Sequence, residues 1–485
     1  MIGLSVRNWF SGDRLRQPTA ASASKHLDNP SRFLFPLTRM KPLPLFALAL
    51  VSTFAQAENW PNWRGPNQDG SSPEKNLPAK FSKTEGVKWA VDVPAVSASV
   101  PAVWGDKVFL TAPIPDKKQL VGLCYDAKTG KELWRRVISE GGLQWDNKSN
   151  LASPSPVTDG ERVIFLFADA VAASFDLAGN PQWKRDFKET HGAFATQWTY
   201  GSSPALDGGK LYIQVLQRNE TFEFQGFPKG TPGKDMTSYI LAVDPATGKD
   251  LWKHLRPTPA AVESLEAFSS PVFATHGGKR VMLITGGDTL TTHDAGTGDE
   301  LARLTTWNLA GEGYNKFFRL VPSPVVGDGI ALVCAPKNSP VFAMPMDSKG
   351  KDVKPLWTSD PKIVTTDVST PAFYEGSFYV LDSGRKTVSR VEPKTGKVIW
   401  TGQTGSKSKF ESSPTVADGK IYMTNFWGDV YVVKAGGDSF ELLSMNEMGN
   451  GSKPNGDAAS CRSSIAVANG CLFIRTQDKL YCIGQ

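Results

Sequence analysis

Short apolar stretches separated by polar turns recur along the chain from Val87 to Ile483. The segment Ser412–Met423, with the sequence SSPTVADGKIYM, is representative. Two short runs of β-type residues flank an Asp-Gly pair, which is a strong signal for a β-hairpin. No long apolar stripe with a period of about 3.6 residues accompanies these units, which argues against a helical array. The pattern therefore predicts an all-β protein.

Eight copies of this hairpin unit can be recognised. They span Ser99–Phe109, Ser155–Phe165, Ser203–Tyr212, Ser270–Leu283, Ser323–Val333, Thr370–Val380, Ser412–Met423 and Ser464–Ile474. All but the last carry a proline near the start, and these prolines follow one another at intervals of 43 to 67 residues. Such spacing leaves room for about one four-stranded sheet per copy, which is the signature of a β-propeller. Proline donates no ladder hydrogen bond, so we expect it at the start of an inner edge strand.

A second repeated unit lies between the hairpins. In Asp244–Trp252, with the sequence DPATGKDLW, Asp244 can cap the turn and Gly248 supplies the positive φ of the reversal. Related turns precede Trp134, Trp183 and Trp400, whereas an insertion delays Trp357 and Ala302 replaces the tryptophan in one copy. We expect each tryptophan to wedge between neighbouring blades. The blade with Ala302 should then have the weakest docking.

The two ends of the repeat region complement each other. The strand around Trp89 has no hairpin before it, and the final unit, residues 464–483, has no outer strand after it. Supplying the first strand to the last blade would close the ring and remove two exposed sheet edges. We therefore predict an eight-bladed β-propeller of four-stranded antiparallel blades over residues 87–485, closed by the N-terminal strand.

Repeats of the form Asp-x-x-Thr-Gly-Lys-x-x-Trp resemble the tryptophan-docking repeats of PQQ-type (quinoprotein-like) β-propellers. The resemblance covers roughly Val87 to Ile483, and the segment WPNWRGP at residues 60–66 is similar to the opening of exported PQQ-repeat proteins. The family includes quinoprotein dehydrogenases and also BamB-like scaffolds of the outer-membrane β-barrel assembly machine, which bind no quinone. The resemblance therefore implies the fold and leaves two functions open.

The chain departs from both branches of this family. It has no vicinal Cys-Cys pair, which quinoprotein dehydrogenases typically carry over the cofactor, and the acidic and amide set that holds their calcium cannot be matched to positions here. BamB-like factors are usually lipoproteins, and no lipid-accepting cysteine follows the apolar segment near the N-terminus.

That segment predicts export. Met40-Lys41 is followed by an apolar run from Leu43 to Phe54 and by Ala55-Gln56-Ala57, the arrangement of a secretory signal peptide. The run is too short to span a bilayer, and no transmembrane segment is expected. We expect cleavage near Ala57 and a periplasmic or secreted protein. Residues 1–39 would be an upstream segment absent from the mature protein, with translation starting at Met40 or, alternatively, a transit segment; residues 58–86 would form an N-terminal arm packed on the propeller.

Charge and cysteine content bear on whether the protein binds nucleic acid, forms disulfides or holds a metal. The formal net charge is +6, but residues 1–57 carry +5 of it, which leaves about +1 for the mature chain and removes the compositional support for nucleic-acid binding. Of five cysteines, Cys461, Cys471 and Cys482 lie close in sequence, and one disulfide among them stays open. No Cys or His spacing suggests a metal site, and we expect no metal and a monomer.

Loops that lead into the inner strands should line the channel mouth. Their candidate binding residues are Trp198, Glu263, Glu266, Arg319, Asp367, Lys409 and Arg462. They could form a ligand pocket, or they could pair with each other and with loop amides to satisfy the mouth. Further polar residues in these loops include Asn147, His191 and Asp457, and the insertion Gln217–Thr237 could be a partner-binding flap or a surface loop.

These patterns favour an exported, non-catalytic scaffold that presents channel-mouth loops to a protein or polymer partner, with no cofactor. The alternative is a PQQ- and calcium-dependent alcohol or sugar dehydrogenase. A hydrolase or lyase that uses channel carboxylates is neither supported nor excluded by the sequence.

Overall fold

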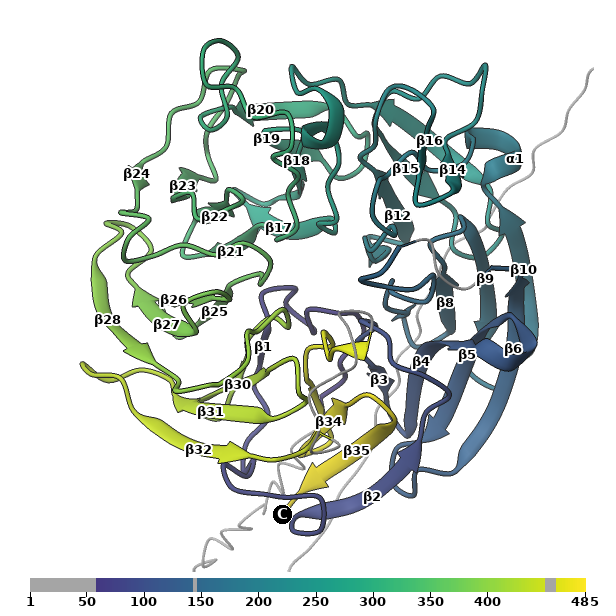
Figure 1. Cartoon of the computed structure of the whole chain (residues 1–485), viewed down its shortest axis with the longest axis vertical. Helices are drawn as coiled ribbons and strands as arrows, with labels where there is room; N and C mark the ends of the chain where they lie inside the picture. Colours follow the sequence, from purple (N-terminus) through teal and green to yellow (C-terminus); the bar gives the residue numbers. More distant parts are fainter. Residues whose placement is uncertain (1–57, 143–145, 450–458) are drawn as a thin grey trace, which may run out of the picture. The chain divides into compact units, whose positions relative to one another are not determined.

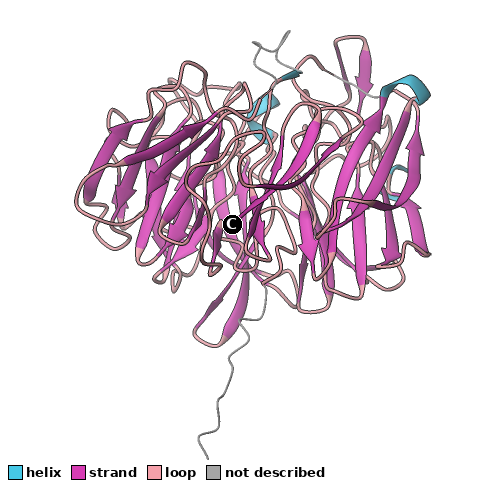
Figure 2. Ribbon diagram, turned by 90° about the horizontal axis from the view of Figure 1, so that it is seen from below, coloured by secondary structure: helices cyan, strands magenta, loops and turns pink. Residues whose placement is uncertain are grey.

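The computed structural model describes residues 58–142, 146–449 and 459–485. Eight four-stranded antiparallel sheets, here called blades 1 to 8, follow one another around a ring (Figure 1). Seen from the side, the strands run across the thickness of the ring (Figure 2). The prediction of an eight-bladed propeller is confirmed. The expected signal peptide at residues 40–57, the segment 1–39 and Asp457 lie outside the described residues.

Blades 1 to 4 follow the chain from the inner to the outer strand. Blade 1 contains β3 (Ala102–Trp104), β4 (Lys107–Ile114), β5 (Gln119–Asp126) and β6 (Glu132–Glu140); blade 2 contains β7 (Val157–Thr158), β8 (Arg162–Leu166), β9 (Val171–Asp176) and β10 (Pro181–Asp186). Blade 3 contains β11 (Ala205–Asp207), β12 (Lys210–Val215), β15 (Tyr239–Val243) and β16 (Asp250–Leu255); blade 4 contains β17 (Val272–His276), β18 (Lys279–Gly286), β19 (Thr289–Asp294) and β20 (Glu300–Leu304).

Blades 5 to 8 complete the ring. Blade 5 contains β21 (Val325–Gly327), β22 (Ile330–Cys334), β23 (Val341–Pro345) and β24 (Trp357–Thr358); blade 6 contains β25 (Ala372–Tyr374), β26 (Ser377–Asp382), β27 (Thr387–Val391) and β28 (Val398–Gln403). Blade 7 contains β29 (Thr415–Ala417), β30 (Lys420–Thr424), β31 (Val430–Lys434) and β32 (Leu442–Asn446), joined by β1 (Ser71–Ser72). Blade 8 contains β33 (Ala466–Ala468), β34 (Cys471–Arg475), β35 (Lys479–Gly484) and β2 (Val87–Asp92).

Other regular elements are short. A hairpin of β13 (Phe222–Phe224) and β14 (Phe227–Lys229) occupies the insertion between β12 and β15. The helical turns are η1 (Pro115–Lys117), α1 (Lys188–His191) and η2 (Val262–Leu265). In the part of the chain that is described, no helix has the length and apolar character needed to cross a bilayer.

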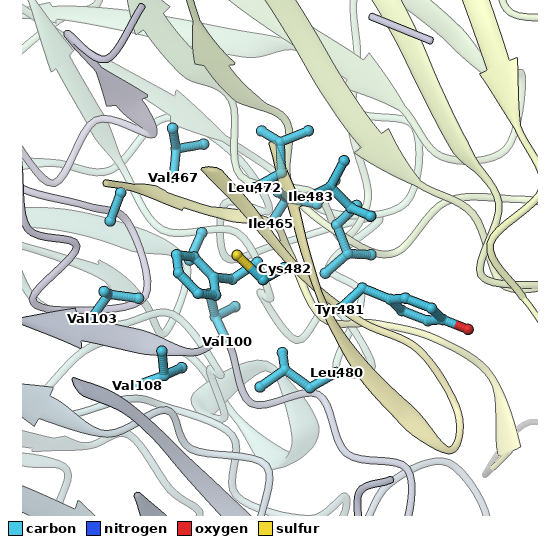
Figure 3. Packing of buried hydrophobic residues seen from close by; sticks show 14 of the residues in the cluster. Val100, Val103, Val108, Ile465, Val467, Leu472, Leu480, Tyr481, Cys482 and Ile483 are labelled. Carbon is cyan, nitrogen blue, oxygen red and sulfur yellow. The ribbon is translucent and has the colours of Figure 1, made fainter. Parts of the chain in front are cut away.

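The ring closes as the sequence predicts. The N-terminal strand β2 pairs antiparallel with the last strand, β35, and places Trp89 opposite Cys482. Behind this junction, Val100, Val103 and Val108 of blade 1 belong to the same buried cluster as Ile465 and other residues of blade 8 (Figure 3). The closure is therefore both a hydrogen-bonded strand pairing and a continuous apolar core.

Six tryptophans each dock one blade onto the turn of the next one. Trp134 Nε1 donates to the carbonyl of Leu177 in blade 2 (3.2 Å), and a Cβ on Gly179 would fall 2.8 Å from its ring. The same donation to a carbonyl in the following blade is made by Trp89, Trp183, Trp252, Trp357 and Trp400. In five of these turns the glycine serves two needs, a positive φ and room for an indole; these glycines are Gly130, Gly179, Gly248, Gly298 and Gly396.

The junction between blades 4 and 5 is built differently because Ala302 has no indole. Ala302 forms a parallel bridge with Gly350, in which Arg303 N donates to Gly350 O (2.8 Å) and Gly350 N donates to Leu301 O (3.0 Å). Backbone hydrogen bonds replace the tryptophan here. Whether this docking is the weakest of the ring stays a prediction.

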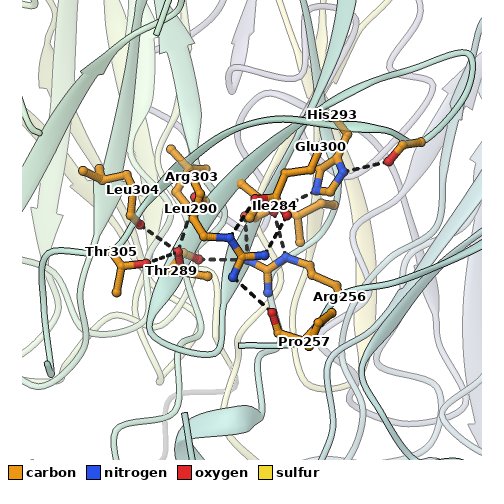
Figure 4. A network of polar contacts seen from close by, with 12 residues as sticks. Arg256, Pro257, Ile284, Thr289, Leu290, His293, Glu300, Arg303, Leu304 and Thr305 are labelled. Carbon is orange, nitrogen blue, oxygen red and sulfur yellow. Dashed lines mark hydrogen bonds and ion pairs between the residues drawn. The ribbon is translucent and has the colours of Figure 1, made fainter. Parts of the chain in front are cut away.

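Buried arginines form a second set of contacts between blades that the sequence pattern did not reveal. Arg256, which follows β16 and is 1% exposed, donates to the carbonyls of Gly286, Ile284 and Thr289 and to Thr291 in blade 4 (Figure 4). Arg475 of blade 8 similarly reaches carbonyls of blade 1 and of the segment leading into it. Burial lowers the pKa of Arg256 to about 9.

The N-terminal arm, residues 58–86, runs across the inner edges of several blades. Trp60 is fully buried and exchanges backbone hydrogen bonds with Val103 of β3, and β1 pairs in parallel with β29. Arg64, 1% exposed, donates to the carbonyls of Pro371 (2.7 Å) and Pro414 (3.0 Å). The arm thus packs on the inner strands of the propeller.

Candidate functional site at the channel mouth

A cavity of about 220 Å³ lies on the ring axis, where the loops enter the inner strands. It is lined by Trp63, Ala98, Val100, Lys148, Ser149, Ser153, Ser155, Trp198, Thr199, Gly201, Ser203, Phe268, Ser270, Arg319, Val321, Val368, Thr370, Glu411, Ser413, Arg462 and Ser464. The segment leading into each of the eight blades contributes to this wall. The cavity is the convergence point that the repeat predicts.

The wall contains a ring of hydroxyl groups that comes from the Ser-Pro start of each hairpin. In every case a backbone amide donates to the hydroxyl oxygen of the next blade, at 2.8 to 3.0 Å. The amide of Val100 donates to the hydroxyl of Ser155, and the amide of each ring residue then donates to the hydroxyl of the next one. The ring residues, in order, are Ser155, Ser203, Ser270, Ser323, Thr370, Ser413 and Ser464. Only the link from Ser464 to Val100 is missing among these positions, because valine has no hydroxyl. The serine or threonine therefore links blades at the point where proline has removed an amide.

Trp198 organises the charges on one side of the mouth. Lys148 Nζ lies 4.3 Å from its ring centroid, and the Arg319 guanidinium lies 5.7 Å from it. Glu263 is almost fully buried and accepts hydrogen bonds from Arg319 Nη1 (3.1 Å) and Trp198 Nε1 (3.4 Å). Arg319 therefore pairs with Glu263, whereas Lys148 contacts the Trp198 ring and forms no ion pair with any described residue.

A similar group of residues lies beside blades 7 and 8. Glu411 accepts from Lys409 Nζ (2.9 Å) and from Arg462 Nε (2.7 Å). Both cations also lie over the ring of Phe426, at 4.6 and 4.7 Å. The carboxylate is held by its neighbours here as well.

Behind Trp198, a buried layer fixes the loop that carries it. Glu266 is fully buried, accepts from Arg218 Nε (2.5 Å) and also accepts from the amide of Gln197 (2.8 Å). Burial raises the pKa of Glu266 to about 7, although the hydrogen bonds from Arg218 oppose that shift. This residue supports the site and does not line the cavity.

The insertion forms an ordered hairpin beside the mouth. Phe224 of β13 packs edge-on against Trp198 with ring centroids 5.0 Å apart, and Arg218 lies over Phe222 at 4.1 Å. Phe227 at the start of β14 is 38% exposed. The hairpin thus extends the wall of the mouth and presents an aromatic side chain to the outside.

The arm closes the channel beneath the hydroxyl ring. Trp63 of the arm belongs to the cavity wall. The arm also bonds to Val103, Thr158 and Val416, which follow the cavity-lining residues along their inner strands. The arm thus covers the inner strands next to the cavity.

The predicted site residues fall into three groups. Trp198, Arg319 and Arg462 line the cavity. Glu263, Glu266 and Lys409 do not line it: Glu263 bonds to Trp198 and Arg319, Glu266 bonds to the amide of Gln197, and Lys409 bonds to the cavity-lining Glu411. Asp367 accepts from the amide of Lys337 at the rim (2.9 Å).

The structure also differs from the sequence prediction at residues other than the seven candidates. His191 contacts the carboxylate of Asp250 in outer strand β16, away from the mouth. The hydroxyl ring and Lys148 were missed, although the repeated Ser before Pro was a visible signal.

The carboxylates do not fit a calcium site. Ca²⁺ takes six to eight oxygen ligands, among them several carboxylates and carbonyls. Within the described ranges, no three His, Cys, Asp or Glu side chains are grouped so that they could hold a metal. Glu263 and Glu411, the carboxylates beside the cavity, are each engaged by cations.

The comparisons with known proteins agree with this architecture. A family model described as outer membrane protein assembly factor BamB matches residues 77–220 and 236–484. The chain belongs to this family. The BamB from Moraxella catarrhalis has a similar structure, with 13% identity, a TM-score of 0.54 and coverage of 81% of this chain and 98% of that one.

Other relatives of this BamB-family propeller are named as dehydrogenases. The quinohemoprotein alcohol dehydrogenase from Comamonas testosteroni matches with 11% identity and a TM-score of 0.59, over 88% of this chain and 81% of that one. A polyvinylalcohol dehydrogenase from a Pseudomonas species is 26% identical over 211 residues, which are 40% of this chain and 29% of that protein. The match thus spans less than a third of that relative. The structural likenesses show the fold alone.

Proposed function

We propose that this BamB-family propeller is an exported, non-catalytic scaffold that binds a protein or polymer partner at the channel mouth. The observation that carries the proposal is that the carboxylates beside the cavity are paired with cations. Glu263 and Glu411 are both held by cations at 3.1 Å or less, so neither is left as a free general base. Cationic and aromatic groups instead face the opening, and such groups recur in binding surfaces.

The rim supports the same proposal. Phe227 at the start of β14 is 38% exposed, and Leu309 and Phe317, between β20 and β21, are 58% and 48% exposed. Large apolar side chains beside a concave opening are typical of interaction sites. The arm covers the inner strands next to the cavity, so the partner would contact the mouth loops. We expect the protein to act as a monomer in the periplasm or outside the cell.

The test is site-specific photo-crosslinking in cells that produce the protein. A crosslinking residue at Phe227 or Phe317 should give a discrete adduct that excess unlabelled protein competes away. Leu133 on outer strand β6, 43% exposed, is the matched control and should give none. Equal adducts at all three positions, or none at the rim, would contradict the proposal.

A second candidate is a PQQ-dependent dehydrogenase, which the polyvinylalcohol dehydrogenase relative favours. Within residues 58–142, 146–449 and 459–485, no group of carboxylates matches a calcium donor set, which argues against it. Titration of the purified protein with PQQ and calcium, read by absorbance and calorimetry, separates the two functions. Saturable binding together with dye-linked oxidation of an alcohol would establish the dehydrogenase and refute the scaffold.

A further inference from the structure

The hydroxyl ring has donor capacity that the propeller does not use. Each ring oxygen accepts one amide hydrogen bond from the neighbouring blade. None of the seven hydroxyls donates to a protein acceptor among the described residues, and all are 1 to 6% exposed. A buried hydroxyl hydrogen without an acceptor is costly, so an acceptor-rich species should occupy the axis.

Six of the seven ring residues line the cavity; they are Ser155, Ser203, Ser270, Thr370, Ser413 and Ser464. Ser323, the remaining member, does not line it. The cavity of about 220 Å³ far exceeds the ~10–15 Å³ that one water needs, so a larger molecule can enter. The donors therefore surround a space of ligand size.

The charge beside this ring has a definite sign. Lys148 and Arg319 line the cavity and lie over Trp198, and the carboxylate close to them, Glu263, is paired with Arg319. Among the described residues Lys148 has no ion-pair partner, because the nearby buried carboxylate of Asp146 is engaged by the amides of Lys148, Ser149 and Thr199. Hydrogen bonds from hydroxyls and a nearby ammonium are the groups that recognise oxyanions.

We infer that the cavity binds an oxyanion group, a carboxylate or a sulfate, with the hydroxyl ring as donors and Lys148 and Arg319 as counter-charges. This inference rests on the proposed binding function and names the chemistry of what is bound. The oxyanion either is a free small anion or is carried by the partner. Water alone would satisfy the hydroxyls but would leave the charge of Lys148 unused.

The first test is isothermal titration calorimetry of the purified protein with citrate and with inorganic sulfate, at constant ionic strength set with sodium chloride. Saturable binding of at least one anion is expected. Lys148→Gln should weaken this binding about tenfold or more, because a hydrogen bond or contact to a charged group is lost. Absence of saturable heat with both anions would overturn the inference.

The ring offers a matched pair of variants. Ser270→Ala and Ser323→Ala each remove one inter-blade acceptor, at 2.8 Å in both cases, so both should destabilise the ring to a similar extent. Because Ser270 lines the cavity and Ser323 does not, Ser270→Ala alone should weaken anion binding, by about fivefold or more. Equal loss in both variants would show that the hydroxyls act only in structure.

Competition identifies the source of the oxyanion. If the partner carries it, citrate should suppress the crosslink formed at Phe227; if it is a free anion, citrate should bind and leave the crosslink unchanged. Either result supports the inference. A crosslink that forms normally while no anion binds would refute the oxyanion site and leave the scaffold function intact.

Discussion

Replacing Trp134 by alanine tests whether the tryptophans hold the blades together. Trp134 is 7% exposed and lies within 6.2 Å, between ring centroids, of Phe109, Phe165 and Phe175. Burial of about 150–250 Å² of indole at about 25 cal/mol/Å² corresponds to about 4–6 kcal/mol, an upper bound because the unfolded chain is partly compact. Comparable core substitutions cost about 3–5 kcal/mol. We therefore expect Trp134→Ala to lower the free energy of unfolding by about 3–5 kcal/mol.

The variant Trp134→Phe separates packing from hydrogen bonding. It keeps an aromatic ring but loses the donation to Leu177 O, so it should lose about 1–2 kcal/mol. Urea unfolding followed by far-UV circular dichroism is the suitable assay, because fluorescence would change with the substitution itself.

A double-mutant cycle with Gly179→Ala makes the test stricter. The new Cβ would lie 2.8 Å from the Trp134 ring, so part of its cost should vanish when the ring is absent. The remainder, from the φ of +85°, should stay. Strict additivity, or an unchanged unfolding midpoint in Trp134→Ala, would refute the docking role.

Three further predictions address other contacts. Arg256→Met should lower the free energy of unfolding by about 3 kcal/mol, because several buried carbonyls lose their donor. Arg280→Met, at an exposed ion pair, should lower it by less than about 1 kcal/mol. Similar losses in the two variants would contradict the role of Arg256 in joining blades 3 and 4. Burial raises the pKa of Asp288 to about 7, so its neutral form stabilises the fold below about pH 4 and this contribution is lost as the pH rises through 7. The melting temperature of wild type should therefore fall relative to that of Asp288→Asn between pH 5 and pH 8, and parallel curves would argue against it. Ala302→Trp should destabilise by about 1–3 kcal/mol rather than restore docking, because Ala302 is 1% exposed against the Gly350 bridge; a more stable variant would reveal an empty docking site.

The sequence predicts this fold well because a different residue pattern in the repeat marks each structural feature of a blade. Asp-Gly pairs mark hairpins, proline marks the inner edge, and the Gly–Trp spacing marks the docking of successive blades. The missing outer strand after residue 483 even predicts the pairing of β2 with β35. Local signals suffice here because most blades make the same kind of contact to their neighbours.

The long-range polar contacts could not be predicted in the same way. Arg64 bonds to carbonyls 307 and 350 residues away, and Arg256 bonds to carbonyls, which every residue possesses. No partner residue type in the sequence identifies such contacts. The site was predicted in part for a related reason. Trp198, Arg319 and Arg462 do line the cavity, but the pairing of Glu263 with Arg319 became visible only when two loops came together.

The Ser-Pro repeat joins structure and site in one pair of residues. Proline removes the amide from the start of seven of the eight inner strands, and in six of these the preceding hydroxyl oxygen accepts the amide of the neighbouring blade, as between Ser203 and Ser270. That geometry uses the oxygen as an acceptor and leaves its hydrogen as a donor toward the axis. A ring selected for closing the propeller therefore creates donors at the channel mouth. The fold alone explains why the hydroxyl oxygens accept amide hydrogen bonds. A test of function must therefore examine the hydroxyl hydrogens as donors and the charge of Lys148, because the fold requires neither.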